Sequence, residues 1–300
     1  MNYTAELIVD AKAVLGESPL WDQNKKVLFW IDGAGKKIHK YNPLTGKDTF
    51  INANQWVGCI ALMEDGNLIA ALQNGIYYVN FEEKTFDFIT NPEEHLPQNR
   101  FNDGKCDAYG RFWAGTMYID ASVKGAGSLY KMEGLKVTKV LSNVTISNGP
   151  VWSIDNRTMY YTDSPTREIS GFDFNIESGT ITNKKTVIKI REDEGIPDGM
   201  TIDEEGYLWI AHWGGGKISR WNPGNGKKIS EIKVSTLNVS CCTFGGENLD
   251  ELYITTGRLE CSSETLKTYP HSGGLYKVKV STKGMKSSRY KKNFSLKSSN

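Results

Sequence analysis

Hydrophobic residues along this chain come in short runs that are separated by polar turns. The pattern is clearest at 196–213, IPDGMTIDEEGYLWIAHW. A Pro-Asp-Gly turn there precedes a short apolar segment, a tight turn and a second segment rich in aromatic and branched residues. Short apolar segments bounded by Gly, Pro, Asn and Asp are typical of β-strands joined by turns. Because no amphipathic helical period is sustained along the sequence, the pattern predicts an all-β protein.

The same unit recurs six times along the chain. Each copy has an aromatic or branched residue at a matching position of its second strand, namely Phe29 or Trp30, Ile69, Trp113, Tyr161, Trp209 and Tyr253. The copies are spaced by roughly 40 to 50 residues, which is the period of four-stranded propeller blades. We therefore expect one six-bladed β-propeller domain over residues 1–290. Since a propeller must close its ring to protect its strand edges, segments 3–13 and 274–280 are expected to complete one blade together.

The net charge and the sequence of the two chain ends indicate which classes of binding partner and which location to expect. The net charge is +1 at neutral pH, so no overall field favours nucleic acid or a membrane surface. No apolar run approaches the roughly 18 residues that span a bilayer. The N-terminus lacks the basic start and apolar run of a signal peptide, so we expect a cytoplasmic protein. Residues 291–300 form a basic tail that we expect to be flexible. The sequence leaves the oligomeric state open.

Four of the six units carry an oxygen-bearing side chain at the same place, just ahead of the first strand. These residues are Glu17, Asn102, Asn148 and Asp198. The first strand of each propeller blade lines the central channel, so equivalent positions in different blades ring its axis at one end. Carboxylate and amide oxygens suit Ca²⁺, Mg²⁺ or Mn²⁺. Asn-Gly and Asp-Gly are also ordinary turn pairs, but four polar residues in one register favour a metal site.

Other catalytic signatures are missing from the sequence. It has no GxSxG nucleophile elbow, no HExxH motif, no P-loop and no dinucleotide fingerprint. His212 follows a predicted strand and could reach the channel, although a packed histidine is the favoured interpretation. Metal-assisted hydrolysis remains, in which a cation polarises a carbonyl or phosphoryl oxygen and a carboxylate positions or deprotonates water.

Four segments resemble the regucalcin / gluconolactonase / luciferin-regenerating enzyme family. They are LGESPLWD (15–22), RFNDGKCDAYGRFWAGTM (100–117), ISNG (146–149) and IPDGMTIDEEGYLWIA (196–211). The resemblance extends to about residue 290 and implies a six-bladed propeller with one divalent cation in its central channel. It implies that Glu17, Asn148 and Asp198 are the metal ligands and that Asp198 is also the general base. Ca²⁺ is the favoured cation, with Zn²⁺, Mg²⁺ and Mn²⁺ as alternatives.

The resemblance also implies a substrate and the residues that bind it. The expected reaction is gluconolactonase-like hydrolysis of a sugar lactone, with Arg100 and Asn102 binding the substrate. Asp120 is the nearest match to a family glutamate that contacts sugar hydroxyls, and its side chain is one methylene shorter. Three alternatives stay open at this point: a phosphotriesterase-like hydrolase on the same metal site, a calcium-binding regulatory protein and a protein-binding scaffold.

Overall fold

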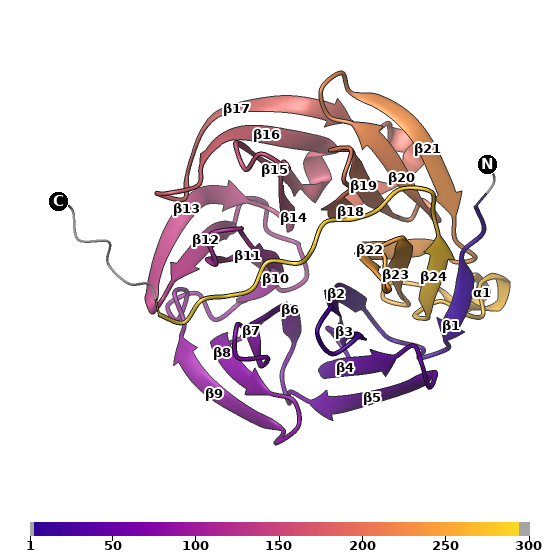
Figure 1. Cartoon of the computed structure of the whole chain (residues 1–300), viewed down its shortest axis with the longest axis horizontal. Coiled ribbons are helices and arrows are strands. Elements are labelled where there is room, and N and C mark those ends of the chain that lie inside the picture. Colours follow the sequence, from indigo (N-terminus) through magenta and orange to yellow (C-terminus); the bar gives the residue numbers. More distant parts are fainter. Residues whose placement is uncertain (1–2, 294–300) are drawn as a thin grey trace.

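The computed structural model describes residues 3–293. Within that range the chain forms six four-stranded antiparallel sheets arranged as a ring around a central axis (Figure 1). The six-bladed β-propeller predicted from the sequence is therefore confirmed. Helical structure is confined in the described range to one α-helix, α1 (Ser263–Thr268), and two short 3-10 turns, η1 (Ser164–Thr166) and η2 (Glu192–Glu194).

In blades one to five the strands run in chain order from the centre of the ring outwards. Blade one contains β2 (Gly16–Asp22), β3 (Val27–Asp32), β4 (Lys37–Asn42) and β5 (Lys47–Asn52). Blade two contains β6 (Val57–Leu62), β7 (Leu68–Leu72), β8 (Gly75–Asn80) and β9 (Thr85–Thr90). Blade three contains β10 (Asn99–Cys106), β11 (Phe112–Tyr118), β12 (Gly127–Glu133) and β13 (Lys136–Val144). Blade four contains β14 (Ser147–Trp152), β15 (Thr158–Asp163), β16 (Glu168–Asn175) and β17 (Thr180–Lys189). Blade five contains β18 (Ile196–Ile202), β19 (Leu208–Trp213), β20 (Lys217–Asn222) and β21 (Lys227–Lys233).

The sixth blade joins the two ends of the chain. Its strands are β22 (Asn238–Gly245), β23 (Glu251–Gly257), β24 (Leu275–Lys279) and, outermost, β1 (Glu6–Val9). The N-terminal strand runs antiparallel to β24, with Glu6 opposite Lys277 and Val9 opposite Leu275. The predicted pairing of 3–13 with 274–280 is thus confirmed. This pairing holds the ring closed with backbone hydrogen bonds between residues far apart in sequence.

Buried tryptophans anchor the second strands to the turns that precede them. The indole nitrogen of Trp113 donates to Asp107 at 2.9 Å, and Trp209 donates to Asp203 at 2.8 Å. Both rings are at most 2% exposed, so their donors need a partner inside the protein. The two aspartates also accept backbone N–H groups of their own turns. The repeated pair therefore fixes each β-turn against the blade core and holds the innermost strands rigidly.

The segment after β24 crosses one face of the propeller (Figure 1). Gly284 N–H donates to Leu249 O at 2.8 Å, and Tyr290 N–H donates to Leu62 O at 2.7 Å. The guanidinium of Arg289 pairs with Asp22 at 2.7 Å. This segment, residues 281–293, thus ties blades six, one and two together across the channel mouth. The rest of the tail expected to be flexible, residues 294–300, lies outside the described residues.

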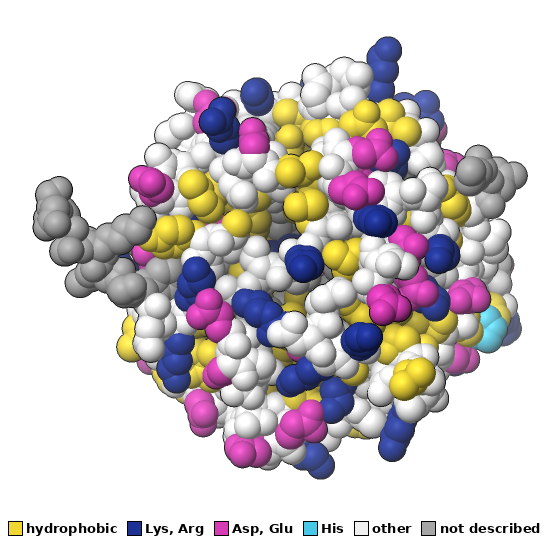
Figure 2. Space-filling model, in the orientation of Figure 1, with side chains coloured by type: hydrophobic (Ala, Val, Ile, Leu, Met, Phe, Trp, Pro, Cys, Tyr) yellow, Lys and Arg dark blue, Asp and Glu magenta, His cyan; other side chains and the backbone are white. Residues whose placement is uncertain are grey.

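Seen from the face that this segment crosses, the surface mixes both signs of charge, and Lys and Arg side chains lie near the central hollow (Figure 2). No helix among residues 3–293 has the length and apolar character that crossing a bilayer would need.

Candidate functional site

In the first strands of four blades, the strand pairing is irregular at the polar residues predicted from the sequence. Strand pairing shifts register between Glu17 and Leu20 in β2, and between Asn148 and Val151 in β14. It also shifts around Asn102 in β10 and Asp198 in β18. Such β-bulges re-aim side chains and are frequent beside active sites. The expected turn at 197–199 is wrong, because these residues belong to strand β18; a bulge uses the same Asp-Gly chemistry as a turn.

All six side chains proposed from the sequence line one cavity of about 450 Å³ at the open end of the channel. They are Glu17, Arg100, Asn102, Asp120, Asn148 and Asp198. They come from four different blades and from positions up to 181 residues apart (17 to 198). The fold therefore brings side chains from distant parts of the chain together in one cavity.

A chain of hydrogen bonds fixes the two asparagines across blades three and four. Arg100 Nη1 donates to Asn102 Oδ1 at 2.9 Å. Asn102 Nδ2 donates to Asn148 Oδ1 at 3.1 Å and to the Ser147 carbonyl at 2.9 Å. Asn148 Nδ2 in turn donates to Ser164 Oγ at 2.8 Å. Since each amide has a donor and an acceptor on defined partners, the carbonyl oxygens of both side chains have fixed orientations.

Arg100 is held tightly beneath the cavity wall. Its guanidinium carbon lies 4.3 Å from the centre of the Trp56 ring, a cation–π arrangement. Its Nη1 also donates to the Phe101 carbonyl at 3.0 Å and its Nε to the Ile119 carbonyl at 3.3 Å. Burial lowers the pKa of Arg100 to about 10. The side chain is therefore still cationic at neutral pH, and among residues 3–293 its Nη2 has no hydrogen-bond partner.

Two carboxyl groups, Glu17 and Asp198, line the floor of the cavity, and the charge of a third, Asp103, acts on both. Burial raises the pKa of Glu17 well above its usual range, and the charges of Asp198 and Asp103 raise it further. Burial likewise raises the pKa of Asp198, with Asp103 as the next contributor. Glu17 is only 9% exposed, so solvent screens these repulsions weakly. Such a cluster is a place where added positive charge is strongly favoured.

Sequence reasoning missed two charged residues near this cluster: Asp103, which belongs to it, and Lys105, whose charge acts on it. Asp103 accepts N–H groups from Gly104 at 2.7 Å and from Gly149 at 2.8 Å. Burial raises the pKa of Asp103 even though the Lys105 ammonium acts to lower it. Neighbouring residues of a regular strand point to opposite faces, so alternation does not assign both Asn102 and Asp103 to one site. The bulge in β10 removes that restriction.

The proposed metal ligands fit a hard cation by their chemistry. Glu17, Asn148 and Asp198 offer only oxygen atoms, which Ca²⁺ and Mg²⁺ prefer. Within residues 3–293 no three His, Cys, Asp or Glu side chains form a metal-binding group, and the proposed set contains two carboxylates and one amide. Burial is the main cause that raises the pKa values of Glu17 and Asp198, and neighbouring carboxylates raise them further, so a bound cation would favour the ionised forms.

Two further residues considered from the sequence, Asp120 and His212, lie in different environments. Asp120 is exposed at the rim, and its Oδ1 accepts the Ser122 N–H at 3.0 Å, a contact with Ser122 that lowers the pKa of Asp120. His212 is fully buried, with Nδ1 2.8 Å from the Glu194 carbonyl and Nε2 2.5 Å from Ser219 Oγ. His212 does not line the cavity, so the packed interpretation of this residue is confirmed.

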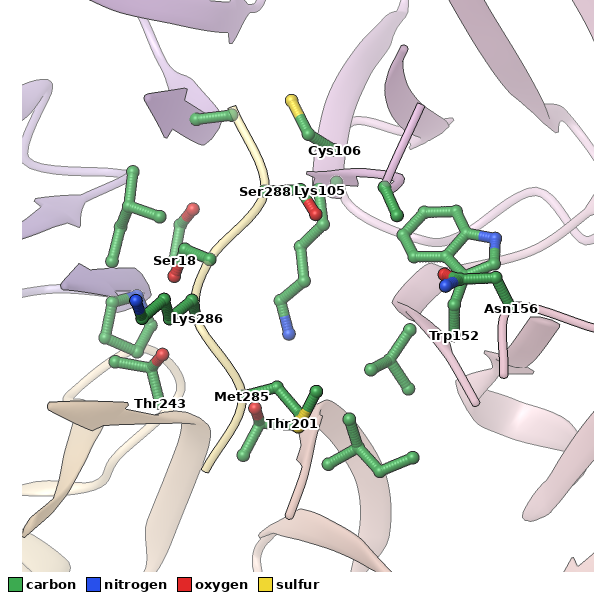
Figure 3. Close-up of a pocket in the computed structure, with 18 of the residues that line it drawn as sticks. Ser18, Lys105, Cys106, Trp152, Asn156, Thr201, Thr243, Met285, Lys286 and Ser288 are labelled. Atoms are coloured by element: carbon green, nitrogen blue, oxygen red, sulfur yellow. The ribbon is translucent and has the colours of Figure 1, made fainter. Parts of the chain in front are cut away.

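A second cavity of about 210 Å³ lies at the other end of the channel. Glu17 lines the first cavity and its neighbour Ser18 the second, so the innermost strand separates the two. Figure 3 shows the Lys105 side chain reaching into this second space, with Trp152 on one side and the 285–288 segment on the other. Lys105 Nζ donates to the Met200 carbonyl. The C-terminal segment covers this mouth, which leaves the first cavity as the open entrance.

Comparisons with known proteins agree with the six-bladed fold. The family described as "SMP-30/Gluconolactonase/LRE-like region" matches residues 15–258. A Bacillus subtilis (strain 168) protein named "Putative sugar lactone lactonase YvrE" is 36% identical over 282 residues, 93% of this chain and 96% of that protein. Regucalcin of Xenopus laevis is 36% identical over 278 residues, 91% of this chain and 93% of that protein. The solved structure of a calcium-binding regucalcin from Agrobacterium tumefaciens str. C58 is 25% identical, with a TM-score of 0.93 over 97% of this chain and 98% of that one. This chain therefore belongs to the SMP-30/gluconolactonase/LRE-like family.

Proposed function

We propose that the protein is a metal-dependent lactonase of the gluconolactonase type, with its active site in the open cavity of the channel. The observation that carries the proposal is that Glu17 and Asp198 line the open cavity together with the buried Arg100, and that burial and the charge of Asp198 raise the pKa of Glu17. Paired carboxyl groups with strongly perturbed pKa values are typical of catalytic sites. The family and the sugar lactonase relative supply the reaction class.

Glu17, Asn148 and Asp198 would hold one divalent cation, with Ca²⁺ favoured by the regucalcin relatives and Zn²⁺, Mg²⁺ or Mn²⁺ as alternatives. When bound, the cation supplies a Lewis acid that polarises the lactone carbonyl and favours the ionised form of a neighbouring carboxylate. The hydrogen bonds from Asn102 and to Ser164 hold the Asn148 amide in one orientation for this purpose.

The residues of the chain account for the remaining chemistry. The Asp198 carboxylate accepts a proton from a water molecule as that water attacks the lactone carbonyl carbon. The bond between this carbon and the ring oxygen then breaks, and the proton passes to the ring oxygen, giving a hydroxy acid. Arg100 keeps Nη2 available to donate a hydrogen bond to a substrate oxygen, since its other donors are bound to the protein. Its charge would stabilise negative charge that develops on the substrate.

Lactone hydrolysis with Ca²⁺, Mg²⁺, Mn²⁺ or Zn²⁺, measured against a chelated sample, tests the proposal. Asp198→Ala should lower kcat by about 10²- to 10⁴-fold, the usual contribution of a general base. Asp87→Ala is the matched control, because Asp87 is exposed on the outer strand β9. Metal-dependent hydrolysis that survives in Asp198→Ala would overturn the assignment of Asp198.

A calcium-binding protein without hydrolase activity is the second candidate, because several relatives are named regucalcin. The same experiments separate the two. Calcium binding by calorimetry that is lost in Glu17→Gln, together with no turnover of any lactone under any metal, would favour the second candidate.

A further inference from the structure

We propose that this site hydrolyses lactones that carry an apolar substituent, and that it does so with higher kcat/KM than fully hydroxylated sugar lactones. The proposal rests on the lactonase function proposed above and adds a substrate class to it. Its physical basis is a division of the cavity into a polar floor and apolar walls.

The floor consists of side chains on the innermost strands. Above it, most of the residues at the ends of strands and in the loops that follow are hydrophobic, and the exposed Asp120 and Glu260 lie among them. Leu15 directly precedes β2, Ile119 directly follows β11, Ile146 directly precedes β14 and Leu259 follows β23. Trp213 ends β19, directly across from Ile196 in the strand ladder. These side chains come from five blades, so apolar groups surround the space in which the substituents of a bound lactone must lie.

The two asparagines of the cavity are committed to the protein, which leaves Arg100 Nη2 and the rim carboxylates Asp120 and Glu260 as the polar groups open to a substrate. Both polar atoms of the Asn102 amide have protein partners, and so do those of Asn148. Asp120 turns one carboxylate oxygen to the Ser122 N–H. A sugar lactone brings several hydroxyl groups, and each one that reaches an apolar wall without a partner weakens binding by about tenfold.

Aromatic rings often bind sugars through the apolar faces of the sugar ring, but Trp56 is poorly placed for this. The Arg100 guanidinium covers one of its faces at 4.3 Å. The other wall residues are branched or straight-chain hydrocarbons, apart from Trp213, and they offer no flat face. An alkyl chain makes full use of such walls, because its burial needs no hydrogen-bond partner.

A series of δ-lactones tests this preference with the full-length protein and the metal that supports activity. The series compares δ-valerolactone, which has no substituent, with homologues that carry methyl to pentyl chains, and with glucono-δ-lactone. We expect kcat/KM to rise about threefold for each added methylene and the pentyl-substituted δ-decalactone to exceed glucono-δ-lactone by at least tenfold. A glucono-δ-lactone value equal to or above that of δ-decalactone would overturn the inference while leaving the lactonase function intact. Failure to hydrolyse every lactone would overturn both.

A substitution in the apolar wall tests whether this wall contacts the lactone substituent. Leu259 is half-buried on a loop, so Leu259→Ser removes wall area without interrupting a strand. We expect it to lower kcat/KM for δ-decalactone about fivefold and to leave δ-valerolactone within twofold. Leu44→Ser is the control, because Leu44 is 93% exposed on a distant turn, and it should change neither value. An equal loss on both substrates in Leu259→Ser would show that the wall does not contact the substituent.

Discussion

Acidification should destabilise the blade that carries Asp198, through His212. This histidine lies opposite Pro197 in the ladder between β18 and β19, one residue from Asp198. Burial lowers the pKa of His212 to about 4. The Glu194 carbonyl accepts the Nδ1 proton, while Nε2 accepts the hydroxyl proton of Ser219. Both ring nitrogens of the neutral imidazole thus have hydrogen-bond partners. In the imidazolium, Nε2 also carries a proton and would direct it at Ser219 Oγ, which already accepts a hydrogen bond from Trp221.

The sign and size of the effect follow from linkage. The unfolded chain binds a proton on this histidine with a pKa of about 6.5, whereas the folded chain does so only near pH 4. The contribution to stability is therefore complete above about pH 6.5 and is lost as the pH falls to 4. The difference corresponds to about 3 kcal/mol, a large part of a typical folding free energy of about 5 to 15 kcal/mol.

Urea denaturation at pH values from 7 to 4 measures this loss. The free energy of unfolding of the wild type should fall by about 3 kcal/mol more than that of His212→Gln over this range. His95→Gln, a change at an exposed histidine, should keep the slope of the wild type. An NMR titration of the imidazole should show a midpoint near 4. Identical slopes in His212→Gln and the wild type, or a midpoint near 6.5, would refute the reasoning.

Two other predictions concern arginine side chains. Arg100→Lys loses the planar contact with Trp56 and the hydrogen bond to Asn102, so kcat/KM for a lactone should fall about 10- to 100-fold; a value within twofold of wild type would contradict the substrate-binding role. Arg289→Met leaves the fully buried Asp22 without its ion-pair partner and should lower the free energy of unfolding by about 3 kcal/mol, measured by urea denaturation; an unchanged midpoint would show that the C-terminal segment contributes little.

The propeller was predictable because the sequence repeats the same pattern of apolar strands and polar turns six times. Each blade needs a bulky buried residue at one place in its second strand, and Trp113 and Trp209 mark that place without any knowledge of the fold. The ring closure was also predictable, since an unpaired N-terminal strand and an unpaired C-terminal strand leave one blade incomplete. The exact strand limits were not predictable, because a bulge and a turn draw on the same residues, as at Asp198.

The candidate site was predictable only in part, for a related reason. Register identified Glu17, Asn102, Asn148 and Asp198 because they recur at equivalent positions. Asp103 and Lys105 have no counterparts in the other blades, and only the bulge in β10 places them beside the cluster. The apolar walls were equally hidden, since they combine single residues from loops that are far apart in the chain.

The balance of buried charge at the floor bears directly on what this site needs for hydrolysis. Three carboxyl groups, Glu17, Asp103 and Asp198, face two cations, Lys105 and Arg100. If all five are ionised, one negative charge is in excess, and a water molecule attacking a carbonyl there would create a further negative charge on the substrate. In a site with little solvent, that charge is strongly repelled. The two cations of the chain are therefore insufficient by themselves, which supports the proposed divalent cation as the group that reverses the sign. As a proposed ligand, Glu17 would retain that cation by its charge, so Glu17→Gln should weaken metal binding more than it weakens turnover at saturating metal.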